Sequence, residues 1–419
     1  MNKSGGKSLL WMMPALREQN LNCTICTLVI IPLNALKSDV ETRLGRCGLR
    51  YVSYSPELCK TRLDQLPEFP HVALARIEDI DGRFIQWLHG NHRFVRRLVL
   101  DECHLILTAQ RYRPQMSRVG QIASLGMGLV LLSATLPATL ERALISHLSL
   151  DYASCDIVRV PSTARLNIAY SILHVGDFNA ALKLTKDLLA GQQVQSAPGF
   201  FVGLVYCLTK RDVELVAGWL SNGPGEEYVV LMYHSDCSNE EKATVMQAMH
   251  RQVSGSTKSL IVIGTTAFGT GIDIGAVRVV ISLGGAPSLL EYVQHAGRGG
   301  RDGLPASAVW IDYPEARVIV ESLLPAEDRQ RWEPCQQSQN YVKSIDAAEC
   351  RRKLIGQAVG DVVNVSCPEW ATQENFVQFC DVCSSSTPVG KKLHCTGSYS
   401  VQYLSDAALL RRYPRWNAS

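Results

Sequence analysis

The chain has 419 residues, of which 46% are hydrophobic and 19% are charged. This length accommodates two or three domains, and the balance of residue types excludes a disordered or fibrous protein. A formal net charge of +3 neither indicates nor excludes a polyanionic partner, because local patches matter more than the sum.

The number of cysteines and the lengths of the apolar runs indicate which cellular compartment the protein occupies. The 14 cysteines are too sparse for a small secreted scaffold, which favours a reducing compartment where a cysteine cluster binds metal. No apolar run approaches the roughly 18 residues that cross a bilayer. Residues 9–16 follow two lysines as in a signal peptide, but Arg17 and Glu18 come next without a small-residue cleavage site. We therefore expect an intracellular protein without a membrane partner.

Short apolar runs alternate with stretches of helical period through the first part of the chain. Fully apolar strands between helices are typical of a parallel sheet covered on both faces. We therefore predict an α/β domain over residues 1–154. Its predicted strands are 24–31, 50–54, 71–75, 98–101 and 129–133, and its predicted helices include 33–44 and 137–147.

The alternation pauses over residues 155–167, which contain Pro161 and several polar side chains and are predicted to be a linker. It resumes in a second α/β domain, predicted over 168–324. Its predicted strands are 168–174, 200–207, 228–233, 260–264, 277–282 and 306–312, and its predicted helices include 211–220, 240–252 and 289–293. A Cys-containing module is expected over 335–385, and a loose tail of low periodicity over 386–419.

The string Ser4-Gly5-Gly6-Lys7-Ser8 opens the chain and precedes an apolar helix start. Glycines there let backbone N–H groups close around phosphates, while Lys7 reaches the β/γ oxygens and the Ser8 hydroxyl ligates Mg²⁺. Flexible termini often have the same composition. A phosphate-binding loop normally follows a central strand, and no residues for such a strand precede this one, so we expect its anchoring strand to be missing.

Asp101-Glu102-Cys103-His104 follows the apolar run 98–100. At a strand end, the first carboxylate can hold Mg²⁺ on a nucleotide and the second can orient or deprotonate water. The alternative is a solvated loop start. Ser133-Ala134-Thr135 ends another predicted strand and can relay hydrogen bonds between two sites at the sheet edge, or can cap the helix that starts near Pro137.

Two glycine-containing loops stand in the second domain. The first, residues 267–273, follows a strand that ends at Gly264. The second contains Arg298 and Arg301 among four glycines, after the predicted helix 289–293. Arginine forks suit triphosphate oxygens, so these two are candidate arginine fingers. The alternative is a glycine turn with solvated arginines.

Taken together, these motifs resemble superfamily 2 helicases in type and in order. The string Gln294-x-x-Gly297-Arg298-x-Gly300-Arg301-Asp302-Gly303 is most similar to RecQ-type DNA helicases, as is Tyr233-His234-Ser235. The likeness covers residues 1 to about 385, and relative to the family the N-terminus looks truncated.

The resemblance implies two RecA-like domains with ATP and Mg²⁺ between them. Asp101 and Ser8 would hold Mg²⁺, and Glu102 would activate water. Gln294, Arg298 and Arg301 would reach across from the second domain. The implied ATP-binding residues are Ser4, Gly5, Gly6, Lys7, Ser8, Gly271 and Asp273, and the implied coupling residues are His104, Ser133, Ala134 and Thr135.

Several segments could face nucleic acid. Backbone amides at Pro32-Leu33-Asn34 could hold a DNA phosphate, although Pro32 is equally an ordinary start of a helix. Thr265 and Thr270 could bind phosphate similarly. Tyr112 and Arg113 lie where the resembling family has an aromatic-rich loop that couples DNA binding to hydrolysis. The loop here has no Trp, so we expect weaker coupling.

Cys380-x-x-Cys383 has the spacing of a metal knuckle, and with Cys350 and Cys367 upstream it provides four thiolates for a structural Zn²⁺. The strings around Cys350 and Cys380 look like the zinc module of RecQ-type helicases. The gap from Cys367 to Cys380 is long, and two rival ligands are Cys335 and Cys395. Another pair, Cys23-x-x-Cys26, is predicted to lie in the core of an apolar strand.

The leading hypothesis is an ATP-dependent 3′–5′ DNA helicase or translocase of RecQ type, with Zn²⁺, acting on single-stranded or forked DNA in a nucleus or nucleoid. One alternative is a non-catalytic nucleic-acid-binding relic of a helicase. Another is an RNA-directed ATPase, because no base-reading residue discriminates the 2′-OH. Polarity and the preference for DNA are implied by the resemblance alone.

Overall fold

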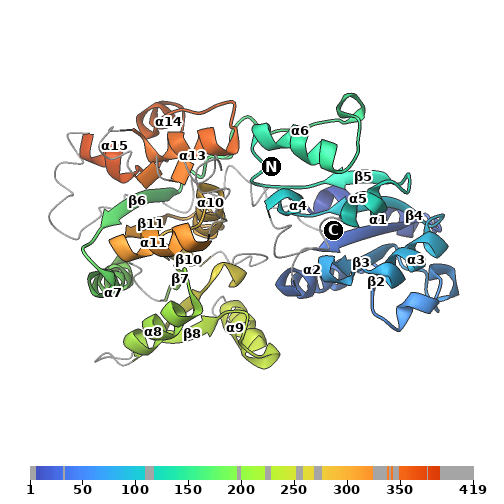
Figure 1. Ribbon diagram of the computed structural model, residues 1–419, viewed down its shortest axis with the longest axis horizontal. Coiled ribbons are helices and arrows are strands. Elements are labelled where there is room, and N and C mark those ends of the chain that lie inside the picture. The colour runs from blue at the N-terminus through green and yellow to red at the C-terminus, as the bar shows by residue number, and fades with distance from the viewer. Residues whose placement is uncertain are drawn as a thin grey trace, which may run out of the picture.

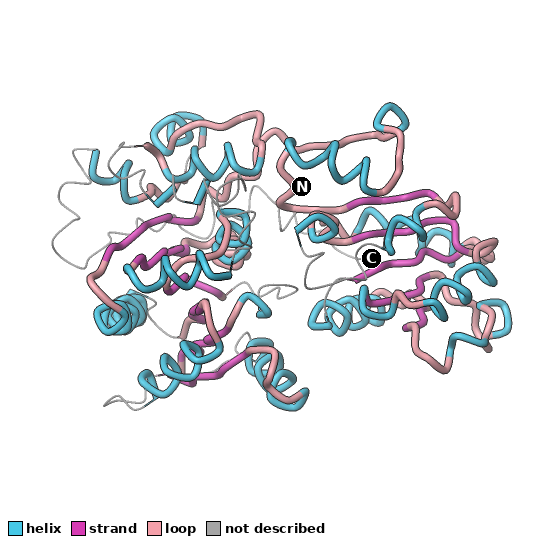
Figure 2. The backbone as a smooth tube through the Cα atoms, viewed as in Figure 1, coloured by secondary structure: helices cyan, strands magenta, loops and turns pink. Residues whose placement is uncertain are grey.

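The computed structural model describes two α/β domains and a small helical module that packs on the second domain (Figures 1 and 2). The domains lie side by side and are joined by a linker without regular secondary structure. The described residues are 6–31, 34–108, 118–195, 200–221, 228–251, 258–268, 276–323, 337–338, 341–342, 349–374 and 376–386.

The first domain contains a parallel sheet of five described strands in the order β2-β3-β1-β4-β5. The register sets Val29 of the central strand opposite Leu74 on one side and Val99 on the other. The carboxyl ends of β1, β4 and their neighbours therefore share one edge. The strands are β1 (Cys26–Ile31), β2 (Tyr51–Ser53), β3 (Val72–Arg76), β4 (Val95–Leu100) and β5 (Gly128–Leu131).

Both faces of this sheet are covered, as the mostly apolar sequence of β1 predicts, and all six residues of β1 are buried. On one face, Trp11 and Leu44 pack against Val29, and on the other Phe84 packs in the cluster around Leu28. The helices are α1 (Leu9–Asn20), α2 (Asn34–Arg46), α3 (Gly82–Asn91), α4 (Leu105–Thr108), α5 (Val119–Ala123) and α6 (Ala138–His147).

The described strands of the second domain form a six-stranded parallel sheet in the order β6-β11-β10-β7-β9-β8. The strands are β6 (Ile168–His174), β7 (Val202–Cys207), β8 (Tyr228–Tyr233), β9 (Ser259–Gly264), β10 (Val277–Leu283) and β11 (Ala306–Asp312). The helices are α7 (Phe178–Gln195), α8 (Lys210–Ser221), α9 (Asn239–Arg251), α10 (Leu289–Ala296) and α11 (Pro314–Leu323).

Side-chain caps fix where the helices leave the sheet edge in the second domain. Before α8, Thr209 and Asp212 each accept a hydrogen bond from the other's backbone N–H. Before α10, Ser288 Oγ accepts from the N–H of Glu291 at 3.2 Å. These bonds satisfy N–H groups that a helix start leaves without partners. As a result, α10 begins at a defined point and carries its C-terminal residues to the domain interface.

The C-terminal module packs on β6 through a buried ion pair. Arg351 donates to both carboxylate oxygens of Asp381, and the N–H of Ile172 in β6 donates to the same carboxylate at 3.0 Å. Its helices are α13 (Arg351–Val359), α14 (Cys367–Gln373) and α15 (Asp381–Ser386). None of the described helices is long and apolar enough to cross a membrane.

The predicted strands are all present; 168–174, 228–233 and 306–312 have the predicted bounds, and the others have ends shifted by one to three residues. β4 begins at Val95, earlier than the predicted residue 98, because Arg97 turns its guanidinium to Glu18 of α1 at 2.9 Å and so fits inside a strand. Cys26 is buried in β1, but Cys23 lies before the strand and is partly exposed, so its prediction as a core residue was wrong. The predicted tail falls almost wholly outside the described residues.

Candidate active site

Two carboxylates and one lysine meet at the carboxyl edge of the first sheet. Asp101 and Glu102 follow β4 directly, and Lys7 precedes α1. The Lys7 Nζ atom lies 3.0 Å from Glu102 Oε1 and 4.0 Å from Asp101 Oδ1. Burial raises the pKa of Asp101 and the charge of Glu102 adds to this, while Lys7 opposes both. The fold thus joins the two motifs that the sequence placed 95 residues apart.

The backbone at Glu102 has a left-handed conformation, with φ of 50°. Side chains other than glycine rarely adopt it, and it costs on the order of 1–3 kcal/mol. The preceding Asp101 helps to hold it, because Asp101 Oδ1 accepts a hydrogen bond from the Glu102 N–H at 3.0 Å. This turn directs the Glu102 carboxylate toward Lys7 and His104.

Ser8 is held from the neighbouring helix, because Arg43 of α2 donates to Ser8 Oγ at 3.2 Å. Sequence reasoning missed Arg43. Its only signal is a basic residue on a helix that follows the central strand. Gly6 adopts a φ of 68°, which glycine accommodates without strain. Ser4 and Gly5 of the same predicted loop lie outside the described residues.

His104 connects the carboxylate pair to a second strand end. Its Nδ1 atom lies 2.9 Å from Ser133 Oγ and 3.5 Å from Glu102 Oε2. Its Nε2 atom lies 2.8 Å from the amide nitrogen of Gln294. An amide nitrogen only donates, so Nε2 accepts and the imidazole proton sits on Nδ1, where it is donated to Ser133. Each ring nitrogen of the histidine is therefore held by a polar partner, one in each domain.

Gln294 reaches from α10 of the second domain to the first. The same amide nitrogen also donates to Thr135 Oγ1 at 3.1 Å, and the N–H of Thr135 donates to Ser133 Oγ. The alternative in which residues 133–135 cap α6 was wrong, because α6 follows Pro137 and has no side-chain cap. This hydrogen-bond network links the two sheets at their carboxyl edges.

Arg298 and Arg301 lie in the turn that follows α10. Arg298 is only 6% exposed and Arg301 is partly buried, so the alternative of two solvated arginines was wrong. Sequence reasoning missed a nearby aromatic pair, in which Tyr206 of β7 stacks on His295 with 3.8 Å between ring centroids. Burial raises the pKa of Tyr206, and the charges of both arginines oppose that rise. The turn thus keeps two cations near the end of β7.

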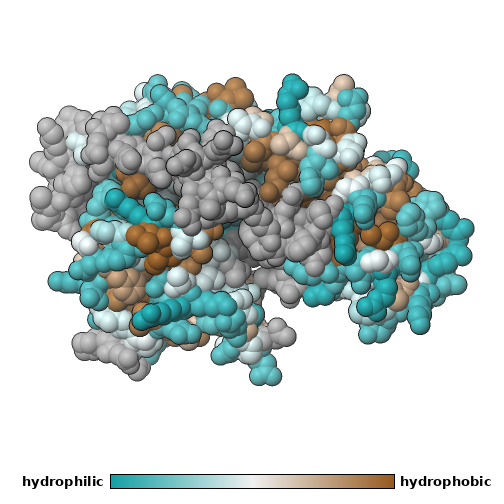
Figure 3. Space-filling model, viewed as in Figure 1, coloured by the Kyte–Doolittle hydropathy of each residue, from teal (hydrophilic) through white to brown (hydrophobic). Residues whose placement is uncertain are grey.

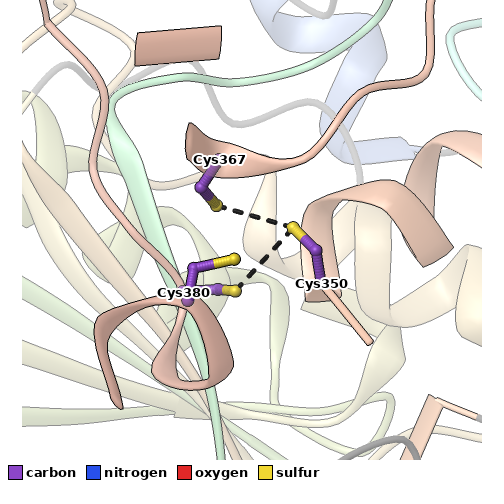
Figure 4. Close-up of side chains that lie close together, drawn as sticks. Cys350, Cys367 and Cys380 are labelled. Carbon is purple, nitrogen blue, oxygen red and sulfur yellow. Dashed lines mark hydrogen bonds between the residues drawn. The ribbon is translucent and has the colours of Figure 1, made fainter. Parts of the chain in front are cut away.

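Four cysteines converge in the C-terminal module (Figure 4). Their sulfur atoms all lie within 4.8 Å of one another, with 3.6 Å from Cys350 to Cys367 and 3.9 Å from Cys350 to Cys380. Tetrahedral zinc with Zn–S bonds of about 2.3 Å separates its ligands by about 3.8 Å. All four, including Cys383, are buried. The four predicted zinc ligands therefore lie together. The two rival ligands, Cys335 and Cys395, lie outside the described residues.

Arg352 supplies a positive charge to this cluster. Its Nη1 atom donates to Cys367 Sγ at 2.6 Å, and Nη2 donates to the carbonyls of Ile168 and Gln378. A guanidinium beside a group of thiolates offsets part of their negative charge. Hydrogen bonds from the neighbouring thiols lower the pKa of Cys350. The donor set and its surroundings fit a divalent thiophilic metal such as Zn²⁺.

Comparison with known proteins identifies both halves of the chain. The DEAD/DEAH box helicase family matches residues 1–143, and the helicase conserved C-terminal domain matches residues 185–303. The chain is 26% identical to the ATP-dependent DNA helicase RecQ of Pasteurella multocida, over 91% of this chain and 56% of that protein. It is 28% identical to the ATP-dependent DNA helicase hus2/rqh1 of Schizosaccharomyces pombe, over 85% and 27%. The chain belongs to the RecQ-like superfamily 2 helicases.

Solved helicase structures share the fold. Dbp5 of S. cerevisiae bound to RNA and ADP BeF3 matches with a TM-score of 0.57 and 16% identity, over 82% of this chain and 88% of that one. Lhr of Mycobacterium smegmatis bound to ssDNA and AMP-PNP matches with a TM-score of 0.56 and 18% identity, over 82% and 45%. The two parallel sheets are therefore RecA-like domains. This RecQ-like chain spans from about a quarter to three fifths of the curated relatives' length.

The predicted nucleic-acid face of this RecQ-like chain is largely outside the described residues. Thr265 is described, and its N–H donates to the Tyr233 carbonyl at 3.3 Å. Asn34 begins α2, but its side chain is not among those described. The predicted residues outside the described part of the chain are Pro32, Leu33, Tyr112, Arg113, Thr270, Gly271 and Asp273.

A cavity of about 490 Å³ lies between β5, α6 and the linker, beside the end of the hydrogen-bond network at Ser133. Apolar side chains such as Leu131, Ile145 and Val158 line it, in the region where Figure 3 shows brown surface over β5 and α6. Ser133 and Ala134 form part of its wall, whereas Lys7 and the two carboxylates do not.

Proposed function

We propose that this chain hydrolyses ATP between its two RecA-like domains and uses the cycle to move 3′ to 5′ along DNA. The observation that carries the proposal is the contact of Gln294 with both His104 and Thr135. This contact ties the arginine turn of one domain to the carboxylate pair of the other. A single substrate bound between them would therefore touch groups from both domains.

Each group has a role that its chemistry supports. Lys7 binds the β- and γ-phosphates, in exchange for its present contact with Glu102. Asp101 and Ser8 would hold Mg²⁺, which would supply positive charge to offset the negative charge on the phosphates. Glu102 orients and deprotonates the attacking water. Arg298 and Arg301 stabilise negative charge on the transferred phosphoryl group, as arginine fingers do.

ATP binding then couples to movement through the interface. Phosphate contacts from Lys7 and the two arginines pull the domains together, and loss of the γ-phosphate removes part of that attraction. Because Gln294 meets His104 beside the catalytic carboxylate, the interface senses the state of the nucleotide. The first domain (residues 1–154) and the second (168–324) act as the moving bodies, with 155–167 as the connection.

DNA, single-stranded or forked, is the proposed track. The support is that the curated relatives are named DNA helicases. A chromosomal partner implies a nuclear or nucleoid location. The cysteine module (residues 335–385) would hold one Zn²⁺ through Cys350, Cys367, Cys380 and Cys383 as a structural element that keeps α13 and α15 against β6. That zinc supplies no catalytic step.

Purified protein tests the proposal. ATP turnover should rise with single-stranded DNA, and Glu102→Gln should lower it by about 100-fold or more, in line with the loss of a general base. Glu41→Gln is the matched control, since Glu41 lies on α2 of the same domain and contacts Ser53 and Lys37. Equal turnover of wild type and Glu102→Gln would refute the role of Glu102.

The rival functions give different results in the same experiments. A non-catalytic relic would bind DNA and show no turnover above background. An RNA-directed ATPase would be stimulated by single-stranded RNA and not by DNA of the same sequence. Polarity is measured by displacement of streptavidin from DNA biotinylated at the 3′ or the 5′ end. Faster displacement from the 3′ end would contradict movement toward the 5′ end.

A further inference from the structure

Residues 161–167, here called the linker segment, are fastened along one side to the cysteine module. The N–H of Val363 donates to the Pro161 carbonyl at 2.8 Å, and the N–H of Gln378 donates to the Leu166 carbonyl at 2.7 Å. Between these points, Thr163 donates through both its N–H and its hydroxyl to Asp361. Ser162 donates to the same carboxylate. The linker segment therefore has a fixed path past the end of α13.

From this anchored position, Arg165 reaches the arginine turn. Its guanidinium donates to three backbone carbonyls, those of Gly297 at 3.3 Å, Gly299 at 2.9 Å and Gly300 at 2.7 Å. Asn167 adds bonds from its amide nitrogen to the carbonyls of Gly300 and Leu304. These contacts span more than 130 positions of sequence, so no local pattern signals them.

The carbonyls that Arg165 binds lie on both sides of Arg298 and directly before Arg301. Three carbonyl dipoles that converge on one point repel one another unless a cation neutralises them. The fork of a guanidinium fits several acceptors at once, which a lysine cannot do. Gly300 also has a φ of 54°, and a Cβ there would lie 2.4 Å from Asn167 Nδ2. The turn is thus shaped around the linker segment.

We propose that Arg165 is a positioning residue for Arg298 and Arg301, held in place by the cysteine module through the linker segment. This inference rests on the proposed ATPase function for its effect on rate. Arg165 itself touches no phosphate in this account. It sets the backbone from which the two arginines extend, so its loss displaces them without removing them.

Steady-state kinetics of Arg165→Ala and Arg165→Lys test the role. A displacement of about 1 Å in a catalytic group can cost up to about 100-fold in rate, so kcat of Arg165→Ala should fall by about 10- to 100-fold. The Arg165→Lys value should lie between those of Arg165→Ala and wild type. Affinity for ADP should change less than about 2-fold, because arginine fingers act on the γ-phosphoryl group.

Arg159→Ala is the matched control. Arg159 also lies in the connection between the domains, but its guanidinium bonds Glu141 and the Leu136 carbonyl of the first domain. Its loss removes hydrogen bonds of the same kind without touching the arginine turn. It should keep most of the wild-type kcat. A loss equal to that of Arg165→Ala would overturn the specific role of Arg165.

A double-mutant cycle separates positioning from general damage. If Arg165 acts through Arg298, then Arg165→Ala should cost much less in a background that already carries Arg298→Ala. Fully additive losses would overturn the inference. Melting temperatures of all variants check folding, and Arg165→Lys provides the readout if Arg165→Ala does not fold.

Hydrogen exchange tests the same contact without turnover. Peptides that cover residues 296–305 should exchange faster in Arg165→Ala than in wild type, and at the wild-type rate in Arg159→Ala. Unchanged exchange would overturn the inference whatever the kinetics. If wild type shows no ATPase activity, the proposed function fails. Faster exchange in Arg165→Ala but not in Arg159→Ala would still show that Arg165 stabilises the arginine turn.

Discussion

Gln294 and His104 face each other across the two domains with their Nε2 atoms 2.8 Å apart. The amide donates and the imidazole accepts, so the contact fixes the tautomer of His104 as well as the position of α10. His104 in turn contacts Ser133 and lies near Glu102. A substitution at Gln294 should therefore alter the surroundings of the carboxylate pair in the other domain.

Replacement of Gln294 by Ala should uncouple the domains. We expect kcat for ATP to fall by about 10-fold or more, because the groups from the second domain lose their fixed position. Stability should change little, since the side chain is partly exposed and its removal leaves no apolar cavity. Turnover and melting temperature measure the two effects, with Gln121→Ala on the exposed face of α5 as the control.

A second variant sharpens the test of the tautomer. Gln294→Glu places an acceptor opposite His104 Nε2, which must then carry a proton to restore the hydrogen bond. Turnover of Gln294→Glu relative to wild type should therefore rise as the pH falls. A ratio that does not change with pH would argue against the assigned donor and acceptor.

Two glycines of the arginine turn should respond differently to the same substitution. Gly300 and Gly303 both have positive φ, so an Ala costs about 1 kcal/mol at either position. At Gly303 the new Cβ meets nothing within 4 Å, whereas at Gly300 it meets Asn167 and the Leu304 carbonyl. Gly300→Ala should lower stability further and slow turnover, and Gly303→Ala should retain activity. Denaturant unfolding and ATPase assays compare them.

Substitution of one cysteine of the cluster should abolish zinc binding. Wild type should bind about one zinc per chain, measured by elemental analysis, and Cys383→Ala should bind almost none. Its melting temperature should fall by roughly 5 °C or more, as should that of wild type after chelation. Cys26→Ala, at a buried cysteine of β1 outside the cluster, should retain zinc. Full zinc content in Cys383→Ala would rule out the four-cysteine site.

Glu291 of α10 should make stability depend on pH. Its carboxylate Oε2 is buried, no described residue donates to it, and burial raises its pKa from 4.5 to about 7. Ionisation of this group therefore opposes folding once the pH exceeds its unfolded pKa. The penalty grows from about pH 4.5 to about pH 7 and is on the order of 3 kcal/mol above that.

The variant Glu291→Gln removes this penalty. It should match wild type below about pH 4.5 and unfold at higher denaturant concentration above about pH 7. Unfolding curves at several pH values give the difference directly. Equal stability of the two proteins at pH 8 would show that water or a neighbour satisfies the carboxylate. Glu315→Gln on α11 is the control for loss of a surface charge.

The sequence by itself determined the fold class and the identity of most groups in the site. Apolar runs such as 26–31 and 202–207 favour buried strands over helices, because they are short and rich in β-branched and aromatic residues. Asp101 and Glu102 at the end of such a run had to lie at the carboxyl edge of a sheet. The spacing of Cys380 and Cys383 is likewise a local signal. These inferences needed only neighbours in the chain.

The tertiary structure alone decided which of these groups meet. Lys7 contacts Glu102, Gln294 contacts His104, and Arg165 holds the turn around Arg298 because of the order of strands in each sheet and the approach of the two domains. Sequence periodicity indicates which face of a strand or helix is apolar. It does not indicate which distant segment of the chain that face will contact. The roles of Tyr206 and Arg165 could not be predicted from the sequence for that reason, since each contacts residues about 90 to 135 positions away.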